Sequence, residues 1–234
     1  MPDPRLAREG GMSLDRIDVH DHAALFFLTS EEKERCLGKL VSLACHRDEA
    51  CIFVMRREDD GVVRNIMSIA GLNRDRLSTE DRMSLVDPRE ELVGQEVTAS
   101  LLLDIIEDLI DSSLDKGFTA VRLFTDMDLI GELLAGQELM IYESLSNELF
   151  DEKNAIGFCL VNATSNSPSV MSSIITHPTL IIKGYVCLNH FFMPPDEFSR
   201  LIGDLPSMHF MLDKLLEIQM SEFVPRSSGR TSRR

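Results

Sequence analysis

Two spacings of apolar residues alternate along the chain. Short continuous apolar runs predict strands that are buried on both faces, and longer segments with an apolar residue every three or four positions predict amphipathic helices. Strands are expected at 23–28, 51–55, 83–86, 120–124, 155–161 and 185–192, and helices at 31–45, 62–70, 97–114, 129–149, 169–176, 196–202 and 207–223. Repeated strand–helix units predict an α/β fold in three layers, with a mostly parallel sheet flanked by helices.

Residues at the predicted helix ends support these boundaries. Ser30 stands before two glutamates and is expected to cap the first helix. Gly71 and Gly117 are expected to end the second helix and the long helix over 97–114. Gly131 and Gly136 weaken the helix predicted over 129–149.

No internal repeat or low-complexity linker interrupts residues 15–205, so a single domain is predicted there. Residues 1–14 are expected to form a flexible N-terminal segment, and 206–223 a C-terminal helix that packs on the domain or on a partner. Residues 224–234 are basic, rich in serine and glycine and free of large apolar side chains, which predicts a disordered tail.

Composition narrows the class of protein. The 234 residues are 44% hydrophobic and 27% charged, which is typical of a globular domain, and the net charge is −15. This charge argues against direct contact with nucleic acid, because phosphate binding needs a positive surface. There is neither an apolar run long enough to cross a membrane nor a signal peptide, so a cytoplasmic location is expected. An odd number of cysteines, five, without a Cys-x-x-Cys pair predicts reduced thiols.

Two helix faces are candidate partner-binding surfaces. Acidic residues follow one face of the helix over 97–114, and methionine and leucine residues follow one face of the last predicted helix. The first is interpreted as a solvated face, with a docking surface for a basic partner as the alternative. The second is expected to pack on the domain's own sheet or on a partner. The residues are Asp104, Glu107, Asp108, Asp111, Met208, Met211 and Leu215.

The segment after the first strand excludes an ordinary phosphate loop. Such a loop needs glycines for close backbone approach and a lysine for the phosphates, followed by a hydroxyl residue. Here the strand is followed by Thr-Ser-Glu-Glu at 29–32, so two carboxylates stand where phosphate charge would lie. ATP hydrolysis of the usual kind is therefore not expected, and a nucleotide bound in another way stays an open alternative.

Metal and catalytic patterns are weak. His20 and His22 would point to the same side of an extended chain and form half of a zinc site, but the other histidines are scattered along the sequence. No metal and no cofactor are predicted on this basis. Cys159 lies in an apolar run and is interpreted as a small hydrophobic residue. Asp126 follows the strand at 120–124 and is interpreted as a helix cap, with a magnesium-ordering carboxylate as the alternative.

A series of short motifs resembles the MEDS domain, a sensory module first described in methanogens and methylotrophs. The resemblance covers residues 17–200, and the run Asn-x-Phe-Phe-x-Pro-Pro-x-x-Phe is its most specific part. In chain order the motifs are Asp21-His22, RLFTDM (122–127), YESLSN (142–147), FCL (158–160), His177-Pro178 and NHFFMPPDEF (189–198). The sequence departs from the family pattern at His20, Leu129 and Leu160, and it contains no tryptophan.

The resemblance implies a RecA/KaiC-like fold without the phosphate-binding Walker A motif, and a pocket at the carboxyl ends of the strands. The ligand-binding residues that it implies are Asp21, His22, Arg122, Asp126, Tyr142, Glu143, His177, Asn189, Phe191, Phe192, Pro194 and Pro195.

It also implies a non-enzymatic sensory or regulatory module, which binds an unknown small-molecule ligand and signals through a protein partner in transcriptional or metabolic regulation. Two alternatives stay open: a degenerate RecA/KaiC-like nucleotide-binding protein, and a structural component of a larger assembly. A homo-oligomer also stays open, because RecA-like relatives commonly assemble through their edges.

Overall fold

The computed structural model describes residues 13–73, 77, 80–134, 136–164 and 168–201. It divides the chain into two compact units, Met1–Pro195 and Asp196–Arg234. The first unit contains the sheet and the candidate site. Of the second unit, the described residues comprise most of helix α8 (Pro195–Leu201). The helix predicted over 207–223, with Met208, Met211 and Leu215, lies outside the described residues.

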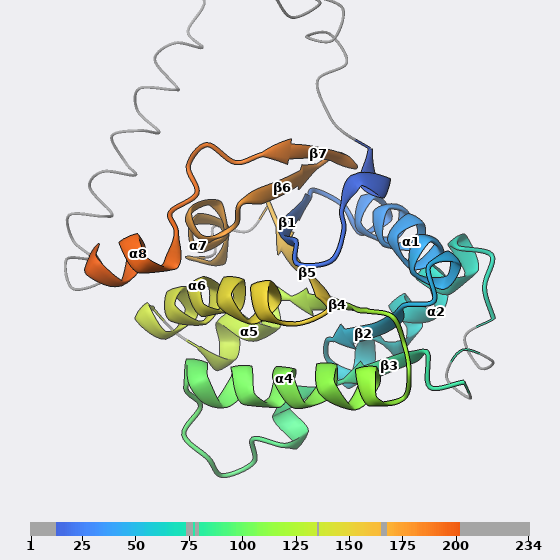
Figure 1. Cartoon of the computed structure of the whole chain (residues 1–234), viewed down its shortest axis with the longest axis horizontal. Coiled ribbons are helices and arrows are strands. Elements are labelled where there is room, and N and C mark those ends of the chain that lie inside the picture. Colours follow the sequence, from blue (N-terminus) through green and yellow to red (C-terminus); the bar gives the residue numbers. More distant parts are fainter. Residues whose placement is uncertain (1–12, 74–76, 78–79, 135, 165–167, 202–234) are drawn as a thin grey trace, which may run out of the picture. The chain divides into compact units, whose positions relative to one another are not determined.

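A seven-stranded sheet forms the centre of the first unit, with the strand order β3-β2-β4-β5-β1-β6-β7 (Figure 1). All neighbouring strands are parallel except β6 and β7, which are antiparallel. The strands are β1 (His22–Phe27), β2 (Ala50–Val54), β3 (Met83–Val86), β4 (Val121–Asp126), β5 (Ala155–Asn162), β6 (Thr179–Ile182) and β7 (Tyr185–Leu188). The predicted α/β class, with a mostly parallel sheet, is thereby confirmed.

Helices cover both faces of the sheet (Figure 1). One core packs α1 and α2 against side chains such as Leu25 and Phe53, and the other packs α4, α5 and α6 against side chains such as Ala24 and Ile52. The faces alternate because successive residues of a strand point to opposite sides. The α-helices of this unit are α1 (Ser30–His46), α2 (Asp60–Ile69), α4 (Ala99–Asp115), α5 (Met127–Leu133), α6 (Gln137–Glu152) and α7 (Pro168–Thr176), and its 3-10 helices are η1 (Leu14–Arg16), η2 (Arg57–Asp59) and η3 (Pro88–Glu90).

Two predicted helix boundaries were wrong. The cap of α1 is Thr29, whose Oγ1 accepts a hydrogen bond from the amide of Glu32 at 3.2 Å, while Ser30 is already helical. The single helix predicted over 129–149 is two helices, α5 and α6, because the chain becomes extended at Leu134 and takes a positive φ of 59° at Gly136. Glycine adopts that conformation without the steric cost of a side chain.

The prediction for the last strands was also incomplete. Residues 185–192 were expected to form one strand, but β7 ends at Leu188 and pairs with β6, which the sequence pattern did not reveal. The connecting Lys183 and Gly184 have φ angles of 52° and 78°, as in a two-residue hairpin turn. Lysine is not among the residues favoured in such a turn, so the usual hairpin signal was absent.

No helix within the described ranges is long and apolar enough to cross a bilayer.

Candidate functional site

Four ligand-type side chains meet on the sheet face that packs against α6. His22 opens β1, Cys159 lies in β5, Glu143 lies on α6, and His177 lies between α7 and β6. All four are buried, with exposed fractions of 0% to 4%. One ligand atom from each residue can be chosen so that all four atoms lie within 4.8 Å of one another. The fold therefore builds one compact cluster, the buried cluster, from three elements and the connection between α7 and β6.

The atoms of the buried cluster approach each other in two pairs. His22 Nε2 lies 3.4 Å from Cys159 Sγ, and His177 Nε2 lies 3.2 Å from Glu143 Oε2. The two imidazole rings lie 4.0 Å apart between centroids and are tilted by 43°. The His177–Glu143 pair has a short distance but lacks hydrogen-bond alignment, so Glu143 Oε2 and His177 Nε2 have no hydrogen-bond partner among the described residues.

The outward atoms of the two histidines are held by acceptors. The Nδ1 of His22 donates to Asn147 Oδ1 at 3.1 Å, because the amide nitrogen of Asn147 is used on three backbone carbonyls, including that of Thr176 at 2.8 Å. The Nδ1 of His177 donates to the carbonyl of Ser173 at 3.0 Å. Carbonyl oxygens only accept, so this network assigns the proton of each ring to Nδ1 and leaves both Nε2 lone pairs facing the centre of the cluster.

Burial keeps the buried cluster uncharged. It lowers the pKa of His22 to about 4 and that of His177 well below its usual range, since the interior disfavours the imidazolium. Burial likewise raises the pKa of Glu143 to about 8 and that of the Cys159 thiol well above its usual range. Burial therefore favours the neutral form of all four groups, and Glu143 Oε2 and His177 Nε2 have no hydrogen-bond partner among the described residues.

Tyr142 and Asn189, both named from the motifs, lie next to this cluster. Asn189 is buried and donates from Nδ2 to the carbonyl of His177 at 2.7 Å, so it fixes the backbone that carries the imidazole. Tyr142 is also buried and belongs to the core under α6. Asp21 lies outside the cluster, because its Oδ2 accepts from the amide of Asp18 at 2.8 Å.

The segment after β7 packs through its backbone. The amide of Phe191 donates to Asn189 Oδ1 at 3.0 Å, and the amide of Met193 donates to the carbonyl of Ile175 on α7 at 2.8 Å. Phe191 is exposed, while Phe192, Pro194 and Pro195 are half-buried. Apart from the bond of Asn189 to the carbonyl of His177, the described contacts of this segment therefore support α7.

The prediction of one pocket at the carboxyl ends of the strands was wrong for most of these residues. His22 begins β1, His177 precedes β6, and Asn189 follows the antiparallel β7, so all three lie toward the amino ends of the parallel strands. The motif order along the sequence does not reveal this, because the direction of β7 decides on which edge Asn189 lies.

Arg122 is the clearest departure, because it lies on the opposite face of the sheet. It shares the side of β4 that carries Phe124, in the core under α1 and α2, and its guanidinium lies 5.9 Å from the ring centroid of Phe158. Its Nε pairs with the carboxylate of Glu49, and both side chains are buried. The alternation of side chains along a strand therefore separates Arg122 from the buried cluster.

Asp126 caps α5, which confirms the interpretation as a helix cap. Its Oδ1 accepts from the amides of Asp128 at 2.9 Å and Leu129 at 3.3 Å. Asp126→Ala is expected to lower the free energy of unfolding by about 1 kcal/mol, and Asp126→Asn to change it little, because asparagine caps as well as aspartate. Urea denaturation measures both. An equal loss in the two variants would contradict the cap and point to a role for the charge.

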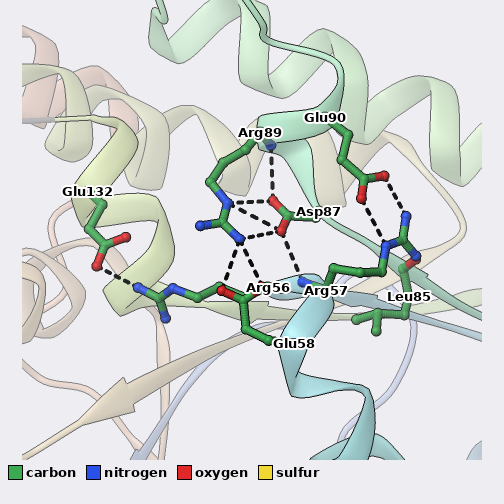
Figure 2. A network of polar contacts seen from close by, with 8 residues as sticks. All are labelled: Arg56, Arg57, Glu58, Leu85, Asp87, Arg89, Glu90 and Glu132. Atoms are coloured by element: carbon green, nitrogen blue, oxygen red, sulfur yellow. Dashed lines mark hydrogen bonds and ion pairs between the residues drawn. The ribbon is translucent and has the colours of Figure 1, made fainter.

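A charged network occupies the carboxyl ends of β2 and β3 (Figure 2). Asp87 is buried and accepts from the amides of Arg57 at 3.0 Å and Arg89 at 3.1 Å, and its Oδ2 lies 2.5 Å from Nη2 of Arg89. Arg56 reaches across to Glu132 on α5 at 2.5 Å. These arginines are paired with carboxylates, so the network joins β2, β3 and α5.

Asp87→Asn is expected to cost on the order of 1 to 2 kcal/mol at pH 7. The hydrogen bonds from Arg89 lower the pKa of Asp87 from 3.8 to about 2. The expected loss of stability is set below the value that this shift alone would give, because the side chain of Arg89 is 40% exposed and water screens the pair. A lowered pKa stabilises the fold above pH 4, and this contribution is lost between about pH 4 and pH 2. Urea denaturation at several pH values should therefore show the two proteins converging toward pH 2. The exposed-pair control Glu90→Gln should lose less stability than Asp87→Asn, because water screens an exposed pair.

Two open grooves lie along α1, away from the buried cluster. One has a volume of about 420 Å³ and is lined by residues that include Arg35, Lys39 and Lys183. The other has a volume of about 470 Å³ and is lined mainly by η1, α1 and the end of α2. Neither is lined by a residue named from the motifs.

The predicted acidic face on α4 is partly neutralised. Lys153 pairs with Glu107 at 2.7 Å and with Asp111 at 2.8 Å, whereas Asp104 and Asp108 are exposed.

Sequence reasoning missed Asn147, Ser173 and Glu49 and assigned Cys159 to the apolar core. A signal was present for Asn147, because it lies one helical turn after Glu143 on the same face of α6.

The mostly parallel sheet with helices on both faces is the fold of KaiC-like, RecA-type proteins, and the phosphate loop of such proteins does not follow β1 here. A family model described as "MEthanogen/methylotroph, DcmR Sensory domain" (MEDS) matches residues 21–178. The chain therefore belongs to the MEDS family of sensory domains.

Solved structures agree with this fold. The chain is similar to the KaiC-like protein PH0186 from the hyperthermophilic archaeon Pyrococcus horikoshii OT3, with 15% identity, a TM-score of 0.53, and coverage of 73% of this chain and 77% of the other. It is also similar to the uncharacterized protein PH0321 from Pyrococcus horikoshii, which was solved with an unknown peptide. There the identity is 14% and the TM-score 0.52, with coverage of 78% and 86%. No curated protein sequence matches.

Proposed function

We propose that this protein is a non-enzymatic sensory module that binds a small molecule at the buried cluster and signals through contact with another protein. Membership of a sensory family supports the general role. The choice of site is carried by Glu143 Oε2 and His177 Nε2, which are fully buried and have no hydrogen-bond partner among the described residues. Buried polar atoms without partners are costly, and a ligand that pairs with them recovers that cost.

The start of α1 argues against a nucleotide at the place where RecA-type proteins hold one. The amide of Glu32 donates to Thr29, and the carboxylate of Glu32 accepts from the amide of Leu28 at 3.0 Å. The helix terminus is thus occupied by its own side chains, and negative charge stands where phosphate would bind.

Signalling would follow from a shift between two packings. The buried cluster joins β1 and β5 to α6 and to the end of α7, and it is closed in this structure, so a small molecule has to open it. Opening would move α6 or α7 relative to the sheet, and ligand binding would then favour the open population. Lys153 follows directly after α6 and pairs with Glu107 and Asp111 on α4, which connects the cluster to the acidic face.

The acidic face of α4 is the surface that we propose for the protein partner. Asp104 and Asp108 are exposed on this helix, so a basic surface of another protein would meet unpaired negative charge there. Affinity capture from native extract, with Asp104→Asn/Asp108→Asn as the matched control, tests this surface. Equal capture by both forms would contradict it.

A thermal-shift panel of one-carbon compounds, small hydrocarbon derivatives and nucleotides tests the function. A ligand at 100 times its Kd is expected to stabilise the protein by about 2.7 kcal/mol. Glu143→Gln should abolish the response, and Glu148→Gln, at an exposed position on the same helix, should retain it. Absence of any response would contradict the proposal, and so would a nucleotide response that survives Glu143→Gln.

A further inference from the structure

The side chains of the buried cluster are those of a transition-metal site. It offers one thiol, two imidazole nitrogens and one carboxylate oxygen. In a tetrahedral zinc site with bonds of about 2.0 to 2.3 Å, neighbouring ligand atoms lie about 3.3 to 3.7 Å apart. The two close pairs, at 3.4 Å and 3.2 Å, match this spacing. All four atoms lie within 4.8 Å of one another, so the most widely separated atoms would have to approach each other by roughly 1 Å to reach the spacing of a zinc site.

The surrounding hydrogen bonds orient these atoms as metal ligands require. Metal-bound histidines usually donate their second ring N–H to a carbonyl or carboxylate, which fixes the tautomer and turns the other nitrogen to the ion. His22 does so with Asn147, and His177 with the carbonyl of Ser173. Ser173 Oγ also donates to Glu143 Oε1 at 2.8 Å, so the other carboxylate oxygen faces the cluster.

The unpaired atoms are independent evidence for a ligand. Glu143 Oε2 and His177 Nε2 are buried, lie 3.2 Å apart and have no hydrogen-bond partner in the described part of the chain. A metal ion between them would satisfy both atoms at once, which a hydrogen bond in the observed alignment does not.

Charge balance favours a divalent ion. Binding converts the Cys159 thiol to a thiolate and the Glu143 carboxyl to a carboxylate and releases two protons to solvent, so two negative charges neutralise one M²⁺. A thiolate with two imidazoles selects zinc-like ions over magnesium and calcium, which prefer oxygen ligands.

We infer that His22, Glu143, Cys159 and His177 form a closed four-ligand site for one zinc-class transition-metal ion. This inference rests on the proposed function in that it uses the same site, and a small molecule that signals there would have to displace one of the four protein ligands from the ion. With all four positions of the tetrahedron taken by protein, the site has the composition of a structural or regulatory centre, since catalytic zinc sites keep an open position.

Metal analysis and cobalt spectroscopy of the full chain test the inference. The protein purified without chelator should contain about one equivalent of zinc by mass spectrometry. After chelation, Co²⁺ should give intense tetrahedral d–d bands and a thiolate charge-transfer band. Cys159→Ser should abolish the charge-transfer band, while Cys187→Ser, at a half-buried thiol outside the cluster, should retain it. Ser173→Ala should weaken zinc binding about 10- to 100-fold through the lost support of Glu143.

Circular dichroism of each metal-free variant shows whether it folds. If Cys159→Ser does not fold, Ser173→Ala still tests the site, because it retains all four ligands. Absence of stoichiometric zinc together with absence of the cobalt bands overturns the inference, and so does a charge-transfer band that persists in folded Cys159→Ser. If no metal binds but the small-molecule panel stabilises the protein through Glu143, the inference fails and the proposed function stands. If metal binds and the panel gives no response, the metal site stands and small-molecule sensing fails.

Discussion

Glu49→Gln is expected to lower the free energy of unfolding by about 3 to 5 kcal/mol, the largest effect of any substitution considered. Arg122 is fully buried and Glu49 is its only charged partner among the described residues. Its Nη1 and Nη2 already have no hydrogen-bond partner in that part of the chain. Removing the carboxylate charge leaves a guanidinium without compensation in the interior, and breaking a buried pair from one side carries a cost of this size.

Chemical denaturation of three variants separates the charge effect from packing. Glu90→Gln removes the charge from an exposed pair with Arg57 and should cost far less than Glu49→Gln, because water screens that pair. The double variant Glu49→Leu/Arg122→Met should recover most of the stability, because apolar replacements of a buried pair are often neutral or stabilising. A Glu49→Gln loss no larger than that of Glu90→Gln would show that Arg122 is compensated in another way.

Gly157→Ala is expected to destabilise the protein by about 2 to 3 kcal/mol and to disturb the buried cluster. Gly157 lies in β5 between α6 and β1, and a Cβ there would lie 2.5 Å from Phe150 Cζ and 2.8 Å from His22 Cδ2. Contacts this short force the neighbouring rings to move, and overpacking of a dense core typically costs 1 to 3 kcal/mol. Since His22 is one of those neighbours, its Nε2 should shift from Cys159 as well.

Gly131→Ala is the matched control, because a Cβ at that position on α5 meets nothing within 4 Å. It should stabilise the protein by about 0.5 to 1 kcal/mol, since alanine is the better helix residue. Phe150→Leu combined with Gly157→Ala should recover part of the loss by making room for the methyl group. A neutral Gly157→Ala, measured by thermal and urea unfolding, would contradict the close packing of β5 against Phe150.

Local chemistry allowed much of the fold to be predicted. The run at 51–55 could only be a strand buried on both faces, and it corresponds to β2, in which every residue is buried. Asp126 could be recognised as a cap because capping depends on the next three residues alone. The failures occurred where the local signal was ambiguous. Thr29 and Ser30 are both good caps, and the turn at Lys183 lacked the usual hairpin residues.

The candidate site was predictable only in part. His22, Glu143 and His177 were named through the family motifs, whereas Cys159 was assigned to the apolar core and Arg122 to the same site as the histidines. Cys159 is indeed buried among apolar residues, but its sulfur lies 3.4 Å from His22 Nε2. A strand pattern shows which residues share a face of their own strand, but it does not show which face meets α6.

The sequence by itself determined the α/β class, most of the elements and the absence of a phosphate loop, because these depend on side chains within a few positions of each other. The tertiary structure alone decided that His22, Glu143, Cys159 and His177 converge and that Arg122 lies across the sheet from them. That arrangement depends on strand order and on the direction of β7, which brings Asn189 back to the backbone of His177. Both are set by packing between residues far apart in the chain, which no local pattern records.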